Sequence, residues 1–158
     1  MDVSRQLARE LKLNYGVLQA QVDGMTHEES LLQLPFRGNC FNWVLGHLIQ
    51  SRSRMLALAG LEPLWDSADY QRYARESDPI TATAEALPLD KLLADLAHAQ
   101  DQLLARIKRM TPADFEVVPD GEERTVGEQL SFLSWHETYH AGQTELLRQL
   151  AGKDDKVI

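Results

Sequence analysis

The segment from residue 125 to residue 150 constrains the fold of this chain more than any other. Its sequence, TVGEQLSFLSWHETYHAGQTELLRQL, repeats apolar residues at helical spacing over about seven turns. Thr125 with Glu128 three residues later has the pattern of a capping box, in which each side chain satisfies a free backbone N–H of the first turn. Gly152 follows as a typical end signal. The sequence therefore predicts a long final helix over residues 125–150.

His136 and His140 lie four residues apart inside this predicted helix. That spacing puts both side chains on one face, one turn apart. Both imidazoles can then reach one metal ion, each through a neutral ring nitrogen at about 2.0–2.1 Å. Two core or surface histidines without a metal are the alternative, which the spacing alone leaves open.

Length, charge and hydropathy argue against a multidomain, a nucleic-acid-binding and a membrane protein. The 158 residues predict one domain, and 44% hydrophobic with 25% charged residues is ordinary for a soluble globular protein. A formal net charge of −8 argues against binding nucleic acid or an anionic membrane through bulk charge. No apolar run approaches the roughly 20 residues that span a bilayer, and no signal-peptide core is present, so we expect a cytoplasmic protein.

The single cysteine, Cys40, excludes an internal disulfide. A lone cysteine is more often a small buried apolar residue than a reactive thiol. We therefore expect Cys40 to be buried in the core.

Apolar periodicity predicts three further long helices, and no segment has a convincing strand pattern. The predicted ranges are 4–23, a segment starting at Asn39 or Asn42 and ending near residue 59, and 88–110; a short helix over 26–32 and a polar loop over 114–124 complete the pattern. The connection over 61–87 is long enough to span a helix, so the helices on either side of it can run parallel. The predicted fold is an all-α four-helix bundle with a long crossover between its second and third helices.

We expect residues 1–152 to form the bundle and residues 153–158 to be a frayed tail. The crossover contains Trp65, Tyr70 and Tyr73, which could contribute to a dimer interface if they are exposed. Among the small residues of the last helix, Ala141 and Gly142 would let another helix come close.

His47 is the candidate for a third ligand, because it lies on the apolar side of the second long helix together with Trp43. Gly46 beside it costs about 1 kcal/mol of helix stability relative to alanine, so it needs a packing reason. Three neutral imidazoles leave a coordination position open, which is the pattern of catalytic sites. Such a position holds a water of lowered pKa or accepts a thiolate. We expect His27 and His98 to lie in solvated positions.

Two short motifs resemble those of the DinB/YfiT-like family. Residues 43–48 match W-x-x-G-H-L, residues 136–143 match H-x-x-x-H-x-G-Q, and the similarity covers essentially the whole chain. The resemblance implies an up-down-down-up bundle, often a homodimer, with a divalent ion (zinc or nickel) on His47, His136 and His140. Some relatives are thiol-dependent S-transferases or isomerases that use low-molecular-weight thiols such as bacillithiol or mycothiol, and many have no assigned reaction.

Residues 136–140 also satisfy H-E-x-x-H, the zinc-protease pattern in which the glutamate, here Glu137, is the general base. The longer metzincin motif would need glycine at 143 and histidine at 146, where this chain has Gln143 and Leu146. No edge strand is predicted that could hold an extended peptide. We therefore disfavour proteolysis; a catalytic role for Glu137, as a base acting on water, stays a hypothesis beside the simpler expectation of a solvated side chain.

Other polar residues could orient the histidines. Tyr139 and Gln143 lie within a turn of the pair, and Ser51 lies one turn from His47. Asn14 and Tyr15 on the first helix could reach the same cavity.

The leading hypothesis is a divalent-metal-dependent transferase, in which a low-molecular-weight thiol attacks a small electrophile, with metal-assisted hydrolysis close behind. A second hypothesis is a non-catalytic metal-binding or ligand-binding dimer with a role in stress. A third is a helical interaction protein with buried histidines and no metal. The expected partners are a small-molecule substrate and a second copy of the chain, with no nucleic acid and no membrane.

Overall fold

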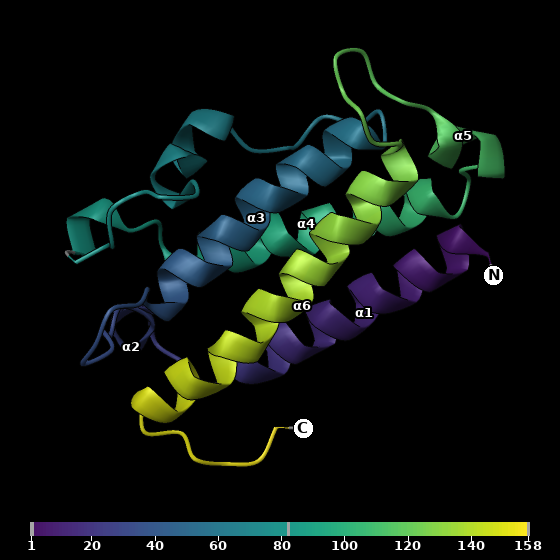
Figure 1. The fold of residues 1–158 in the computed structure, drawn as a ribbon. Helices are drawn as coiled ribbons and strands as arrows, with labels where there is room; N and C mark the ends of the chain where they lie inside the picture. Colours follow the sequence, from purple (N-terminus) through teal and green to yellow (C-terminus); the bar gives the residue numbers. More distant parts are fainter. Residues whose placement is uncertain (1, 82, 158) are drawn as a thin grey trace.

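Four long helices form the body of the molecule in the computed structural model, which describes residues 2–81 and 83–157 (Figure 1). They are α1 (Val3–Val22), α3 (Phe41–Leu58), α4 (Leu89–Ile107) and α6 (Val126–Leu150). The described residues include no strand, so the predicted all-α class is confirmed. No helix among them is both long enough and apolar enough to cross a membrane.

The helices form a ring in which α1 packs against α4 and α6, and α3 packs against the same two helices. Figure 1 shows α1 and α6 running in one direction and α3 and α4 in the other. Hydrogen bonds agree with the parallel pair: Ser134 donates to Glu10 near the start of α1, and Arg148 donates to the Gln21 carbonyl near its end. The up-down-down-up bundle with a crossover between α3 and α4 is therefore as predicted.

Helix α6 begins with the predicted capping box. The Glu128 amide donates to Thr125 Oγ1 at 3.2 Å, and the Thr125 amide donates to Glu128 Oε2 at 2.8 Å. Two of the apolar residues that recur at helical spacing do not face the core, because Tyr139 and Leu146 are 58% and 60% exposed. Gly142 also faces open space, so only Ala141 of the two small residues lies at a helix contact.

Helix α3 begins differently from the prediction. Its N-cap residue is Cys40, which makes no side-chain capping bond, whereas Asn42 is fully buried inside the first turn. The Asn42 amide donates to the Leu87 carbonyl and accepts from the Tyr73 hydroxyl, so it ties the crossover to α3 instead of capping the helix. Cys40 is buried, as expected, and burial raises the pKa of its thiol.

The crossover packs tightly along α3 and contains two 3₁₀ helices, η1 (Ser67–Tyr73) and η2 (Thr83–Glu85). Its three aromatic residues were expected to be available for a dimer interface, and that expectation was wrong because Trp65, Tyr70 and Tyr73 are buried. Their polar atoms are satisfied inside the molecule: the Tyr70 hydroxyl donates to Asp95 at 2.6 Å, and the Trp65 indole donates to Ser53 at 3.1 Å.

Two short helices complete the structure, α2 (His27–Ser30) and α5 (Pro112–Glu116). The sequence predicted α2, but it assigned the region of α5 to a helix end and a loop. Helix α5 forms because a capping box between Thr111 and Asp114 starts it and because the buried Phe115 side chain holds it against the core. Residues beyond α6 have no helix. They were predicted to fray, yet Asp155 accepts a bidentate contact from Arg148 and Lys153 pairs with Glu29.

Candidate metal centre

His47 projects from the middle of α3, and its 5% exposed side chain is held on two sides. Its Nδ1 atom lies 2.7 Å from the Tyr73 carbonyl oxygen. The Trp43 ring, one helical turn earlier, stacks on the imidazole with ring centroids 4.8 Å apart and an interplanar angle of 13°. These contacts fix the plane of the ring and direct Nε2 toward α6.

Gly46 has the packing reason that its position in a helix required. A Cβ atom at this residue would lie 2.5 Å from two ring atoms of Tyr73, well inside van der Waals contact. The absence of a side chain therefore lets the Tyr73 ring lie directly on α3. This close approach also brings the Tyr73 carbonyl to His47.

His136 and His140 project from α6 one turn apart and meet His47 across the α3–α6 contact. The Nε2 atom of His136 lies 3.3 Å from that of His47 and 3.1 Å from that of His140. The three ligand atoms all lie within 4.8 Å of one another. At metal–nitrogen distances of about 2.0–2.1 Å, ligand atoms are about 2.9 Å apart at a right angle and about 3.3 Å apart at a tetrahedral angle. The separations of 3.1 and 3.3 Å fall in this interval.

Hydrogen-bond partners set the tautomers of two of the three rings, His47 and His140. His47 Nδ1 faces a carbonyl oxygen, so it carries the proton and donates, which leaves a lone pair on Nε2. His140 Nδ1 lies 2.6 Å from Gln143 Oε1, and the same reasoning leaves a lone pair on its Nε2. Both lone pairs face His136 Nε2, which can offer one N–H to only one of them. The rings therefore cannot satisfy one another, and three neutral imidazoles are a suitable donor set for a divalent cation.

The protein environment keeps the three imidazoles neutral. Burial, with the nearby charges of His140, His47 and Arg75, lowers the pKa of His136 to about 4. Burial likewise lowers the pKa of His47 and of His140, although their hydrogen bonds act in the opposite direction. Neutral rings are the form that binds metals, so the site needs little deprotonation to accept an ion near pH 7.

Comparison of the sequence with protein-family models found a match that covers most of the chain. The family model described as the DinB superfamily matches residues 10–144, which include all three histidines. The chain belongs to the DinB superfamily. A search of curated proteins found no match. Membership accounts for the helical bundle and agrees with the resemblance of the two histidine motifs.

Glu137, the glutamate of the H-E-x-x-H pattern, is not solvated in this DinB-superfamily protein, and that expectation was wrong. Its side chain is buried against Arg52, which is 0% exposed and donates from Nε and Nη2 to the two carboxylate oxygens at 2.9 and 2.7 Å. Arg52 also donates to the Leu96 carbonyl on α4. A carboxylate with both oxygens engaged by arginine is poorly suited to accept a proton from water. The geometry favours a structural role for Glu137, joining α3 to α6.

The other polar residues expected around the site divide into two groups. Gln143 contacts His140 directly, and the Tyr139 ring meets the His140 ring edge-on with centroids 5.2 Å apart. Asn14, in contrast, bonds to Ser134 and Thr138 at the α1–α6 contact instead of the triad.

The two other histidines of the chain, His27 and His98, lie outside the triad. His98 is exposed, as expected, while His27 in the first turn of α2 is partly buried, and neither joins the triad. No local sequence signal indicated the Tyr73 carbonyl that orients His47. Only Gly46 indicated that something approaches α3 at this point.

Proposed function

We propose that His47, His136 and His140 hold one divalent ion, zinc or nickel, and that this DinB-superfamily protein is a metal-dependent enzyme. The observation that carries the proposal is the grouping of three imidazoles: His136 Nε2 lies 3.3 Å from His47 Nε2 and 3.1 Å from His140 Nε2, and the three ligand atoms lie within 4.8 Å of one another. A divalent ion on three neutral imidazoles keeps a coordination position open, where it lowers the pKa of a thiol or a water so that a nucleophile is available near neutral pH.

Among the possible reactions, transfer of a low-molecular-weight thiol to a small electrophile fits the residues best. Hydrolysis benefits from a general base within hydrogen-bond reach of the attacking water. The candidate base, Glu137, is engaged by Arg52, and no carboxylate joins the histidine cluster among the described residues. A thiol whose pKa is lowered directly does not need such a base. This comparison supports thiol transfer, with metal-assisted hydrolysis as the alternative reaction.

Metal content by mass spectrometry, on protein purified without an affinity tag, tests the site. We expect near-stoichiometric zinc or nickel in the wild type and its loss in His47→Ala, His136→Ala and His140→Ala. His98→Ala, which removes an exposed histidine on α4, is the matched control and should retain the metal. Metal that survives His47→Ala would contradict a site shared by α3 and α6, and metal-free wild type after incubation with both ions would refute the site altogether.

Consumption of an electrophile by the metal-loaded protein tests the reaction. Turnover only when a thiol cosubstrate is present supports thiol transfer, whereas turnover with water alone supports hydrolysis.

A second candidate function is a non-catalytic metal- or ligand-binding dimer. The observation that favours it is a row of exposed apolar side chains on α6, made by Phe132, Trp135, Tyr139 and Leu146. This function predicts that zinc raises the melting temperature of the protein while the protein consumes no class of electrophile. The homodimer and the cytoplasmic location remain proposals, and sedimentation equilibrium of the wild type tests the first.

A further inference from the structure

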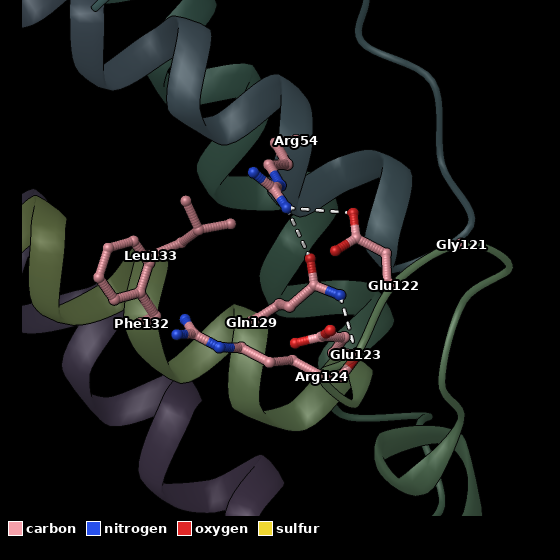
Figure 2. Close-up of a pocket in the computed structure, with 8 residues that line it drawn as sticks. All are labelled: Arg54, Gly121, Glu122, Glu123, Arg124, Gln129, Phe132 and Leu133. Atoms are coloured by element: carbon pink, nitrogen blue, oxygen red, sulfur yellow. Dashed lines mark hydrogen bonds and ion pairs between the residues drawn. The ribbon is translucent and has the colours of Figure 1, made fainter.

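A polar pocket of about 370 Å³ lies between α3, α6 and the loop before α6 (Figure 2). Arg54 on α3 forms one wall, and the loop residues 121–124 form the opposite side. Gln129, Phe132 and Leu133 of α6 line the rest. None of these residues is one of the three histidines, and none belongs to the two family motifs.

Arg54 is held in place by an amide that is itself buried. Gln129 is 5% exposed, and its Oε1 accepts from Arg54 Nη2 at 2.8 Å while its Nε2 donates to the Arg124 carbonyl at 3.1 Å. A neutral amide orients the guanidinium without cancelling its charge. The only ion-pair partner of Arg54 among the described residues is Glu122 at 3.4 Å, and both side chains are about half exposed, so this pair is weak.

Arg124 provides a second guanidinium to the same pocket. Figure 2 shows its side chain extending along α6 toward Phe132, on the other side of Gln129 from Arg54. It has no ion pair within the range that the structure describes. Two arginine forks facing one cavity are suited to bind a carboxylate, since guanidinium geometry matches its two oxygens.

One residue of the pocket wall, Phe132, also contacts the histidine triad. The Phe132 ring lines the pocket and also stacks on His136, with centroids 6.3 Å apart at 26°. Arg54 follows His47 by seven residues on α3, and Gln129 precedes His136 by seven residues on the antiparallel α6. Seven residues of helix span about 10 Å, so Arg54 and Gln129 lie about this far along the helix–helix contact from the histidines.

We propose that this pocket binds the carboxylate end of a small molecule whose other end reaches the triad. The reacting end of this assignment rests on the proposed function, whereas the carboxylate end rests on the pocket alone. Glu122 and Glu123 also line the pocket, so its formal charge is balanced. This balance favours a singly charged carboxylate over a phosphate dianion, which the two glutamates would repel more strongly.

Titration of the metal-free protein, followed by NMR, tests the carboxylate end without any metal. The probes are hexanoate, hexanol and hexyl phosphate, and the readouts are the Gln129 side-chain amide and the Arg54 Nε–H. We expect saturable shifts with hexanoate, little response to hexanol, and an apparent Kd raised about tenfold in Arg54→Gln and in Arg124→Gln, as for loss of one charge-assisted hydrogen bond.

Arg75→Gln is the matched control for the loss of a positive charge near the site. Arg75 is an 88% exposed arginine of the crossover whose charge acts on His136, but it does not line the pocket. Its Kd for hexanoate should equal that of the wild type. Equal responses to hexanoate and hexanol, tighter binding of hexyl phosphate, or a Kd unchanged in both pocket variants would each overturn the assignment.

A second titration connects the pocket to the triad. Cobalt-loaded protein is titrated with mercaptohexanoate and mercaptohexanol, and thiol binding is read from the visible spectrum of the cobalt ion. We expect about tenfold tighter binding of the acid, lost in Arg54→Gln. Equal binding of both thiols refutes the link between pocket and triad while the metal site stands. If cobalt does not bind, the proposed function fails, and the metal-free titration still decides on the pocket.

Discussion

Replacing Gly46 with alanine should destabilise the protein, although alanine is normally the better residue inside a helix. The added methyl group would overlap the ring of Tyr73, which is fully buried and cannot move aside freely. The Tyr73 hydroxyl donates to Asn42 at 2.9 Å and accepts from the Leu87 amide at 2.8 Å, so a shift of the ring also disturbs two hydrogen bonds.

The change in the free energy of unfolding combines one stabilising and two destabilising contributions. Alanine gains about 1 kcal/mol over glycine from helix propensity. Overpacking a filled core costs about 1–3 kcal/mol, and each weakened buried hydrogen bond costs about 1 kcal/mol more. With two such hydrogen bonds weakened, we expect Gly46→Ala to lower the free energy of unfolding by about 2–4 kcal/mol. For a chain of this size that corresponds to a decrease in melting temperature of about 2–4 °C per kcal/mol.

Gly16→Ala is the matched control, because Gly16 lies in α1 and a Cβ there meets nothing within 4 Å. Urea unfolding followed by circular dichroism should show opposite signs, with Gly16→Ala more stable than the wild type and Gly46→Ala less stable. Comparable m-values for the three proteins would establish that stability itself has changed. If Gly46→Ala were as stable as Gly16→Ala, the close approach of Tyr73 to α3 would be refuted.

Three further predictions concern the triad and the buried ion pair. Arg52→Met leaves the Glu137 carboxylate buried without a partner and should lower the free energy of unfolding in urea by about 3–5 kcal/mol. Adding Glu137→Leu should recover most of this stability, and a double variant that stays as unstable as Arg52→Met would contradict the pairing. Zinc at about 100 times its Kd should stabilise the wild type by about 2.7 kcal/mol in thermal unfolding and should leave His136→Ala unchanged; an equal increase in both proteins would place the ion elsewhere. The metal-free protein should lose stability as pH falls from about 6.5 toward 4, because His136 is protonated in the unfolded state at a higher pH than in the folded state. The part of the pH dependence that disappears in His136→Gln measures this contribution. Identical curves of stability against pH for the wild type and His136→Gln would contradict the lowered pKa.

The sequence by itself determined the helices and one pair of ligands. Capping between Thr125 and Glu128, and the spacing of His136 and His140, depend on residues within a turn of one another. Such local interactions are the same whatever the rest of the chain does. The all-α class, the four long helices and the crossover were therefore predictable, as was the family from its two short motifs.

Tertiary structure alone decided which side chains meet across the helices. Whether His47 faces α6, and whether Glu137 is solvated or bound by Arg52, depends on how each helix is rotated about its axis. An error of one residue in that rotation moves a side chain by about 100°. The aromatic residues of the crossover were mistaken for surface because their hydrogen-bond partners lie on α3 and α4, and the pocket between Arg54 and Arg124 had no local signal. These features join residues far apart in the sequence, and only the packed bundle brings them together.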